Sequence, residues 1–143
     1  MEVIKQQISK IFELMGFDKF QLDVDSNKRA IYLSVDDALL TPQRLPNLVL
    51  NINRISRLIA KKQGEAPIVV DINNYRKERE RLIVELAKAA ARRAVATKEL
   101  VPLPPMNAYE RRLIHTELSM RPDVATESVG VGKNRYVVVK IIS

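Results

Sequence analysis

The stretch PPMNAYERRLIHTEL, residues 104–118, predicts a short helix that follows a rigid pair of prolines. Proline lacks a backbone N–H and fixes φ, so the helix cannot include the pair and begins after it. Asn107 is a suitable N-cap, because its side chain can accept a hydrogen bond from an otherwise unpaired amide. On this helix Arg111 and His115, the only histidine of the chain, are spaced i and i+4 and therefore share one face.

An arginine one helical turn from a histidine is a pair that fits a phosphate group. The guanidinium offers a planar fork of donors, and the imidazole donates one hydrogen bond when neutral and two when charged. Arg111 and His115 could therefore hold one phosphate or two adjacent ones, with the amino end of the helix also facing the anion. The alternative is a histidine whose hydrogen bonds are satisfied inside a small core, with the arginine at the surface. The spacing alone leaves both interpretations open.

A long helix is predicted over residues 73–98, ahead of the prolines. Ile83, Ala87, Ala90 and Ala94 form an apolar stripe, which is narrow because alanine allows close packing. The segment 100–106 that follows is extended, because its prolines exclude a helix, and it suits an edge strand. A second face of the long helix carries four cations within about 60° of one another, at 100° per residue. These cations are Lys77, Arg81, Lys88 and Arg92.

Two strands, residues 123–129 and 134–142, are predicted to form a hairpin across the glycine-containing turn GVGK. Lys133 and Arg135 lie in or beside this turn and add positive charge. Tyr109, just ahead of the arginine and histidine, could stack on a nucleic-acid base. Core packing or a hydroxyl hydrogen bond is the alternative role for this tyrosine.

The first half predicts a helix, a hairpin, a second helix and a strand, in that order. The hairpin joins residues 20–24 to 29–35, which alternate apolar and polar side chains, and the last strand covers 67–72. Two sets of apolar residues keep helical spacing. They are Ile4, Ile8, Ile11 and Met15, and Leu48, Ile52, Ile55 and Ile59.

These elements predict an α+β protein of two small αβ domains, residues 1–72 and 73–143, each with helices on a small antiparallel or mixed sheet. Residues 1–72 hold ten basic and nine acidic side chains, whereas residues 73–143 hold fourteen and eight, so most of the net charge of +7 belongs to the second half. Nucleic acid is the commonest acidic partner of such a surface, and a solvated surface without a partner is the alternative.

The residues around Arg111 and His115 resemble a known family. MNAYERRLIH (106–115) looks like the signature of the Arg-xxx-His, or R-three-H, single-stranded nucleic-acid-binding domain, in the form found in the bacterial Jag, or SpoIIIJ-associated, proteins. The resemblance covers about residues 69–142. It implies a cytoplasmic bacterial protein that binds single-stranded RNA or DNA, with RNA and a regulatory role favoured. Charge and this resemblance together give the expected binding residues as Arg111, His115, Arg112, Tyr109, Lys77, Arg81, Lys88, Arg92, Lys133 and Arg135.

In the Jag family the R-three-H module follows a type II KH domain, so the resemblance implies a KH-like first domain. A KH domain that binds nucleic acid has a GxxG loop whose backbone approaches the phosphates. The equivalent loop here, residues 36–47, has no glycine, two prolines and two aspartates that would repel phosphate. We therefore expect a degenerate KH-like domain with a structural or protein-contact role. Arg54, Arg57 and Lys61 form a basic stripe on its helix, which a solvated surface also explains.

No catalysis, metal site or cofactor is expected. The chain has no cysteine and one histidine, and its carboxylates do not cluster as metal-assisted hydrolysis requires. No segment approaches the roughly 20 apolar residues that span a bilayer, so we expect a soluble protein without membrane insertion. A second function remains open, a protein-interaction adaptor whose KH-like half docks a partner.

Overall fold

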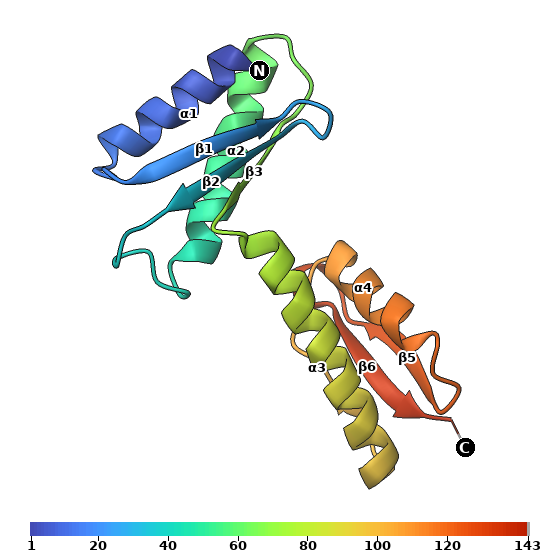
Figure 1. Cartoon of the computed structure of the whole chain (residues 1–143). Helices are drawn as coiled ribbons and strands as arrows, with labels where there is room; N and C mark the ends of the chain where they lie inside the picture. Colours follow the sequence, from blue (N-terminus) through green and yellow to red (C-terminus); the bar gives the residue numbers. More distant parts are fainter. Residues whose placement is uncertain (143) are drawn as a thin grey trace. The chain divides into compact units, whose positions relative to one another are not determined.

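The computed structural model describes residues 1–142, which divide into two compact units. One unit covers Met1–Arg76 and the other begins at Lys77. Each unit has a three-stranded sheet with helices on one face, drawn in blue to green and in yellow to red in Figure 1. The predicted α+β class, with helices on small sheets, is confirmed.

The first unit has a mixed sheet in the order β1-β2-β3. Its elements are α1 (Glu2–Leu14), β1 (Phe20–Asp25), β2 (Ala30–Val35), α2 (Leu45–Lys62) and β3 (Val69–Ile72). β1 pairs with β2 antiparallel through the predicted hairpin, and β3 pairs with β2 parallel. Along β2, Ile31, Leu33 and Val35 are buried, whereas Tyr32 and Ser34 are exposed. The helices therefore cover only one face of this sheet.

α1 buries a stripe that differs from the predicted one. The residues it buries are Ile4, Ile8 and Phe12. Met15, predicted to be buried, is 50% exposed. The ring of Phe12 lies 5.6 Å from that of Phe17 and 5.9 Å from that of Phe20, measured between centroids. This aromatic cluster buries more apolar surface than a methionine at the helix end, which explains the rotation.

α2 is also rotated by about one residue from the predicted stripe. The residues it buries are Ile52, Ser56 and Ala60. Ile55 is 40% exposed, because the small serine and alanine let the other face approach the sheet. The Ser56 hydroxyl donates to the Ile68 carbonyl at 3.2 Å. Asn53 accepts from the Val70 amide at 2.9 Å and donates to its carbonyl at 2.7 Å. Side chains of α2 thus form hydrogen bonds with backbone groups at the outer edge of β3.

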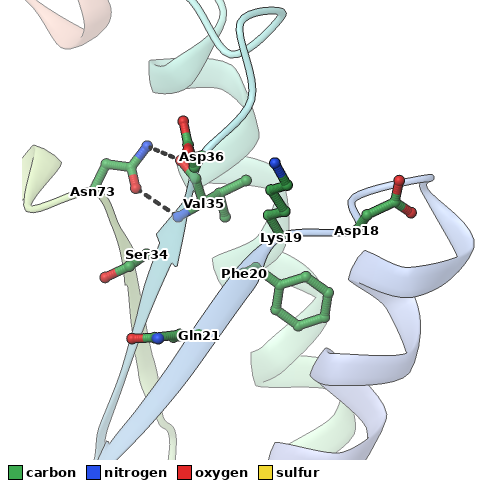
Figure 2. A pocket seen from close by; sticks show the side chains of 8 residues that line it. All are labelled: Asp18, Lys19, Phe20, Gln21, Ser34, Val35, Asp36 and Asn73. Carbon is green, nitrogen blue, oxygen red and sulfur yellow. Dashed lines mark hydrogen bonds between the residues drawn. The ribbon is translucent and has the colours of Figure 1, made fainter.

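Asn73 has the same role at the end of β2. Its Oδ1 accepts from the Val35 amide at 2.8 Å, and its Nδ2 donates to the Val35 carbonyl at 3.1 Å (Figure 2). The residue has φ of 51°, in the left-handed region that asparagine tolerates better than most residues. This end of the sheet holds an open pocket of about 450 Å³. Its lining residues are Asp18, Lys19, Phe20, Gln21, Ser34, Val35, Asp36 and Asn73.

The second unit has an antiparallel sheet in the order β4-β6-β5, so β5 is an edge strand. Its elements are α3 (Tyr75–Thr97), β4 (Val101–Pro102), α4 (Ala108–Leu118), β5 (Val124–Val129), the short 3-10 helix η1 (Gly132–Asn134) and β6 (Tyr136–Ile141). The predicted edge strand in the proline segment is confirmed as β4. The core joins the predicted alanine stripe of α3 to Ile114 and Leu118 of α4 and to Val124, Val137 and Val139 of the sheet.

Replacing Asn53 by alanine should destabilise the first unit by about 1–3 kcal/mol, because the amide and carbonyl of buried Val70 lose their partner. Thermal unfolding followed by circular dichroism measures this loss. Asn51→Ala is the matched control, since Asn51 lies exposed on the same helix. Equal stability of the two variants would show that the side-chain pairing along β3 contributes nothing.

Candidate nucleic-acid interface

The amino end of α4 is closed by a capping box and tied to α3. The Asn107 side chain accepts from the Glu110 amide at 2.8 Å, and the Glu110 carboxylate accepts from the Asn107 amide at 3.3 Å. Arg79 on α3 donates to Glu110 at 2.8 Å, and the Tyr109 hydroxyl donates to Glu80 at 2.8 Å. The predicted N-cap is confirmed. The Glu110 carboxylate at this end is paired with Arg79, and the expectation that this end of the helix faces the ligand stays a prediction.

Arg111 is held by the chain segment that precedes the helix. Its Nη1 donates to the carbonyl of Met106, and the residue is half-buried. The Met106 amide in turn donates to the carbonyl of Arg135 at 3.1 Å, just before β6. The side chain of Arg111 and the backbone carbonyl of the turn residue Arg135 therefore both bond to Met106. An arginine has five N–H donors, so this single bond leaves most of the fork available to a ligand.

The side chain of His115, on α4, contacts the edge strand β5. Its Nδ1 is 2.6 Å from Thr126 Oγ1, and its Nε2 is 2.9 Å from Ser128 Oγ. α4 runs beside β5, drawn in orange in Figure 1. We call Arg111, His115, Thr126 and Ser128 the His115 cluster. The histidine is half-buried, so it is neither a core residue nor an open groove residue, and both of its ring nitrogens already have partners.

Thr126 and Ser128 were not among the residues predicted for the site. The signal was present in the segment VATESV, where strand alternation places both residues on the same face as buried Val124. Polar side chains at the helix-facing positions of a half-buried strand need partners. A neighbouring helix with one histidine supplies them.

Burial lowers the pKa of the His115 imidazole below its ordinary value of 6.5, and the positive charge of Arg111 lowers it further. The ring therefore stays neutral to lower pH than a free histidine does. The charged form of the ring, which could donate two hydrogen bonds, is the main form only below this lowered pKa.

Two of the predicted cations on α3 already have acidic partners. Arg81 pairs with Glu78 on the same helix at 2.6 Å. Lys88 pairs with Glu117 on α4 at 3.7 Å. The basic face predicted from spacing is therefore partly neutralised, because sequence spacing counted the cations without the neighbouring carboxylates.

The remaining predicted residues are exposed and spread over several elements, and none forms an ion pair with another residue of the range 1–142. They are Lys77 and Arg92 on α3, Arg112 on α4, Lys133 in η1 and Arg135 beside β6. None of the ten predicted residues lines the pocket of Figure 2. Over the same described range, no group of side chains suits a metal ion, and no helix is long and apolar enough to cross a membrane.

The lowered pKa of His115 predicts a loss of stability in mild acid. Below about pH 6.5 the unfolded chain takes up this proton more readily than the folded chain, so stability falls as pH decreases through the lowered folded pKa. Between pH 7.5 and 5.5 the wild type should lose more melting temperature than His115→Gln, which cannot titrate. An equal loss of melting temperature in both proteins would show that the lowered pKa of His115 does not cause the pH dependence.

Comparison with known proteins gives one family match and several similar sequences. Residues 81–140 match the R-three-H domain. A protein of Lactiplantibacillus plantarum, named RNA-binding protein KhpB, is 42% identical over 74 residues, which are 52% of this chain and 23% of that protein. Proteins of the same name are 39% identical in Clostridium symbiosum, over 52% of this chain and 33% of that protein, and 36% identical in Bacillus subtilis, over 50% and 36%.

The matched segment therefore spans at most about a third of these relatives, 23% to 36% of their length. The family match contains both Arg111 and His115. The resemblance to the Jag family is confirmed over this part of the sequence, where residues 81–140 match the R-three-H domain family.

Proposed function

We propose that this chain binds single-stranded nucleic acid, RNA in particular, through its R-three-H domain, as a regulatory protein of the bacterial cytoplasm. The observation that carries the proposal is the placement of Arg111. Its guanidinium is oriented by one carbonyl, keeps free donors, and lies inside the segment that matches the domain family. The similar proteins named as RNA-binding favour RNA over DNA.

Arg111 is the main phosphate ligand in this proposal. Arg112, at the next position of α4, and Arg135, whose backbone carbonyl accepts from the Met106 amide, add further positive charge. Lys133, Lys77 and Arg92 extend the attraction for a phosphate chain, which is largely electrostatic and independent of sequence. Arg81 and Lys88 contribute less, because each already has an acidic partner.

In this proposal residues 1–72 form a degenerate KH-like domain that does not bind phosphate. The loop between β2 and α2 uses its own amides. The Asp37 carboxylate accepts from the Leu39 amide at 2.8 Å, and the Asp37 carbonyl accepts from the Leu40 amide at 3.1 Å. A loop that cradles a phosphate must present such amides to the ligand. Because Asp37 already accepts from two of these amides, the proposal assigns nucleic-acid affinity to residues 73–143.

Arg111→Ala should weaken the binding of a single-stranded RNA oligonucleotide by roughly 1.5–3 kcal/mol, the range for a hydrogen bond to a charged group. Fluorescence anisotropy at a stated salt concentration measures the affinity, and thermal melts check the fold. Arg121→Ala is the control, because it removes the same charge from a residue that pairs with Asp123 at 2.8 Å. Equal losses in both variants would mean that Arg111 acts only through net charge.

A protein-interaction adaptor is the second candidate function. The exposed face of α2 combines the cations Arg54, Arg57 and Lys61 with Leu50 and Leu58, which are 50% and 68% exposed. Exposed leucines among cations are more typical of a protein contact than of phosphate binding. This face favours a role of the first unit in docking an acidic protein partner.

Changing Arg54, Arg57 and Lys61 together to alanine separates the two functions. Under the main proposal the triple variant keeps RNA affinity within about twofold at physiological salt, where distant surface charges are largely screened. A loss as large as that of Arg111→Ala would place the nucleic-acid site on the first unit instead.

A further inference from the structure

We propose that Thr126 and Ser128 form a ribose subsite, which binds the 2′-hydroxyl and the adjacent phosphate oxygen of RNA, and that His115 is their positioning residue. The inference rests on the RNA binding proposed above. It assigns the discrimination between RNA and DNA to two hydroxyl groups on the edge strand of the R-three-H domain.

The imidazole of His115 has no free nitrogen to offer to a ligand. Nδ1 is 2.6 Å from the Thr126 hydroxyl, and Nε2 is 2.9 Å from the Ser128 hydroxyl. A phosphate that contacted His115 directly would have to break one of these bonds. The groups left to face a ligand are the hydroxyls.

A neutral imidazole has one N–H, which donates, and one bare nitrogen, which accepts. One hydroxyl accepts the ring N–H and keeps its own O–H to donate. The other hydroxyl donates its O–H to the bare nitrogen and keeps only lone pairs. The pair therefore presents one donor and one acceptor whichever tautomer is present. The lowered pKa of His115 keeps the ring in this neutral state at neutral pH.

A ribonucleotide carries the matching groups. The 2′-hydroxyl can donate to the accepting hydroxyl, and the phosphate on the neighbouring 3′ carbon can accept from the donating one. The Cα atoms of Thr126 and Ser128 lie roughly 7 Å apart along one strand. Their hydroxyls converge on one imidazole ring, at 2.6 and 2.9 Å from its two nitrogens, so neighbouring groups of one nucleotide can meet both. DNA lacks the 2′-hydroxyl, so it would leave the accepting side chain without a partner.

The position of the two residues gives a ligand access to them. Both side chains are half-buried, and β5 is the outer strand of its sheet. Arg111, the proposed phosphate ligand, lies close enough to His115 for its charge to lower the histidine pKa. A phosphate held by Arg111 therefore brings its ribose next to the hydroxyl pair.

The test compares the affinity of the full chain for three single strands of one sequence: RNA, DNA and 2′-O-methyl RNA, which cannot donate. The wild type should bind RNA roughly three- to tenfold more tightly than the other two strands, as one hydrogen bond of ordinary strength gives. Ser128→Ala and Thr126→Val should lose most of this ratio, with a smaller change for DNA. Ser128→Thr and Thr126→Ser keep a hydroxyl and should retain the ratio.

Ser119→Ala is the matched control, since it removes a hydroxyl that donates to the Thr116 carbonyl at 2.7 Å, outside the cluster. Thermal melts confirm that each variant is folded. A wild type that binds RNA and DNA equally, or variants that weaken both strands alike, would overturn the ribose subsite while leaving the proposed function intact. Failure of the wild type to bind any of the three strands would instead overturn the proposed function.

Discussion

The two hydrogen bonds of His115 are the interaction on which the candidate site of the second unit depends. They join the middle of α4 to the outer strand β5 through Thr126 and Ser128, at 2.6 and 2.9 Å. The apolar contacts of Ile114 and Leu118 hold the same helix against the sheet. The Arg111 guanidinium, one turn before the histidine, donates to the Met106 carbonyl. His115 and this carbonyl therefore position the candidate site together.

The elements of the fold were predictable from sequence because their signals are local. The alanine stripe of α3, the Asn107 cap and the prolines that confine β4 to an edge each act within a few residues. The burial of Ser56 and the exposure of Met15 were not predictable, because aromatic packing and close helix–sheet approach override simple apolar spacing. Which face of a helix turns inward is settled by tertiary contacts that lie far apart in the chain.

The residue types of the candidate site were predictable, but their hydrogen-bond partners were not. Arg111 and His115 stood out by spacing and by family resemblance. The partners of these two residues are a backbone carbonyl and two hydroxyls, which carry no distinctive sequence mark. Counting cations also overestimated the basic face of α3, because Arg81 and Lys88 meet carboxylates in the folded chain. Net charge predicts the class of partner, whereas ion pairing determines which cations remain to bind it.

A titration of the isotope-labelled full chain with single-stranded RNA, followed by nuclear magnetic resonance, tests the central claim most directly. The account predicts that chemical-shift changes concentrate at the Arg111 side-chain Nε–H and at the amides of Thr126, Ser128 and Arg135. Residues of α2 and of the loop before it should change little. Changes confined to Arg54 and its neighbours on α2, with an unaltered His115 cluster, would contradict the account.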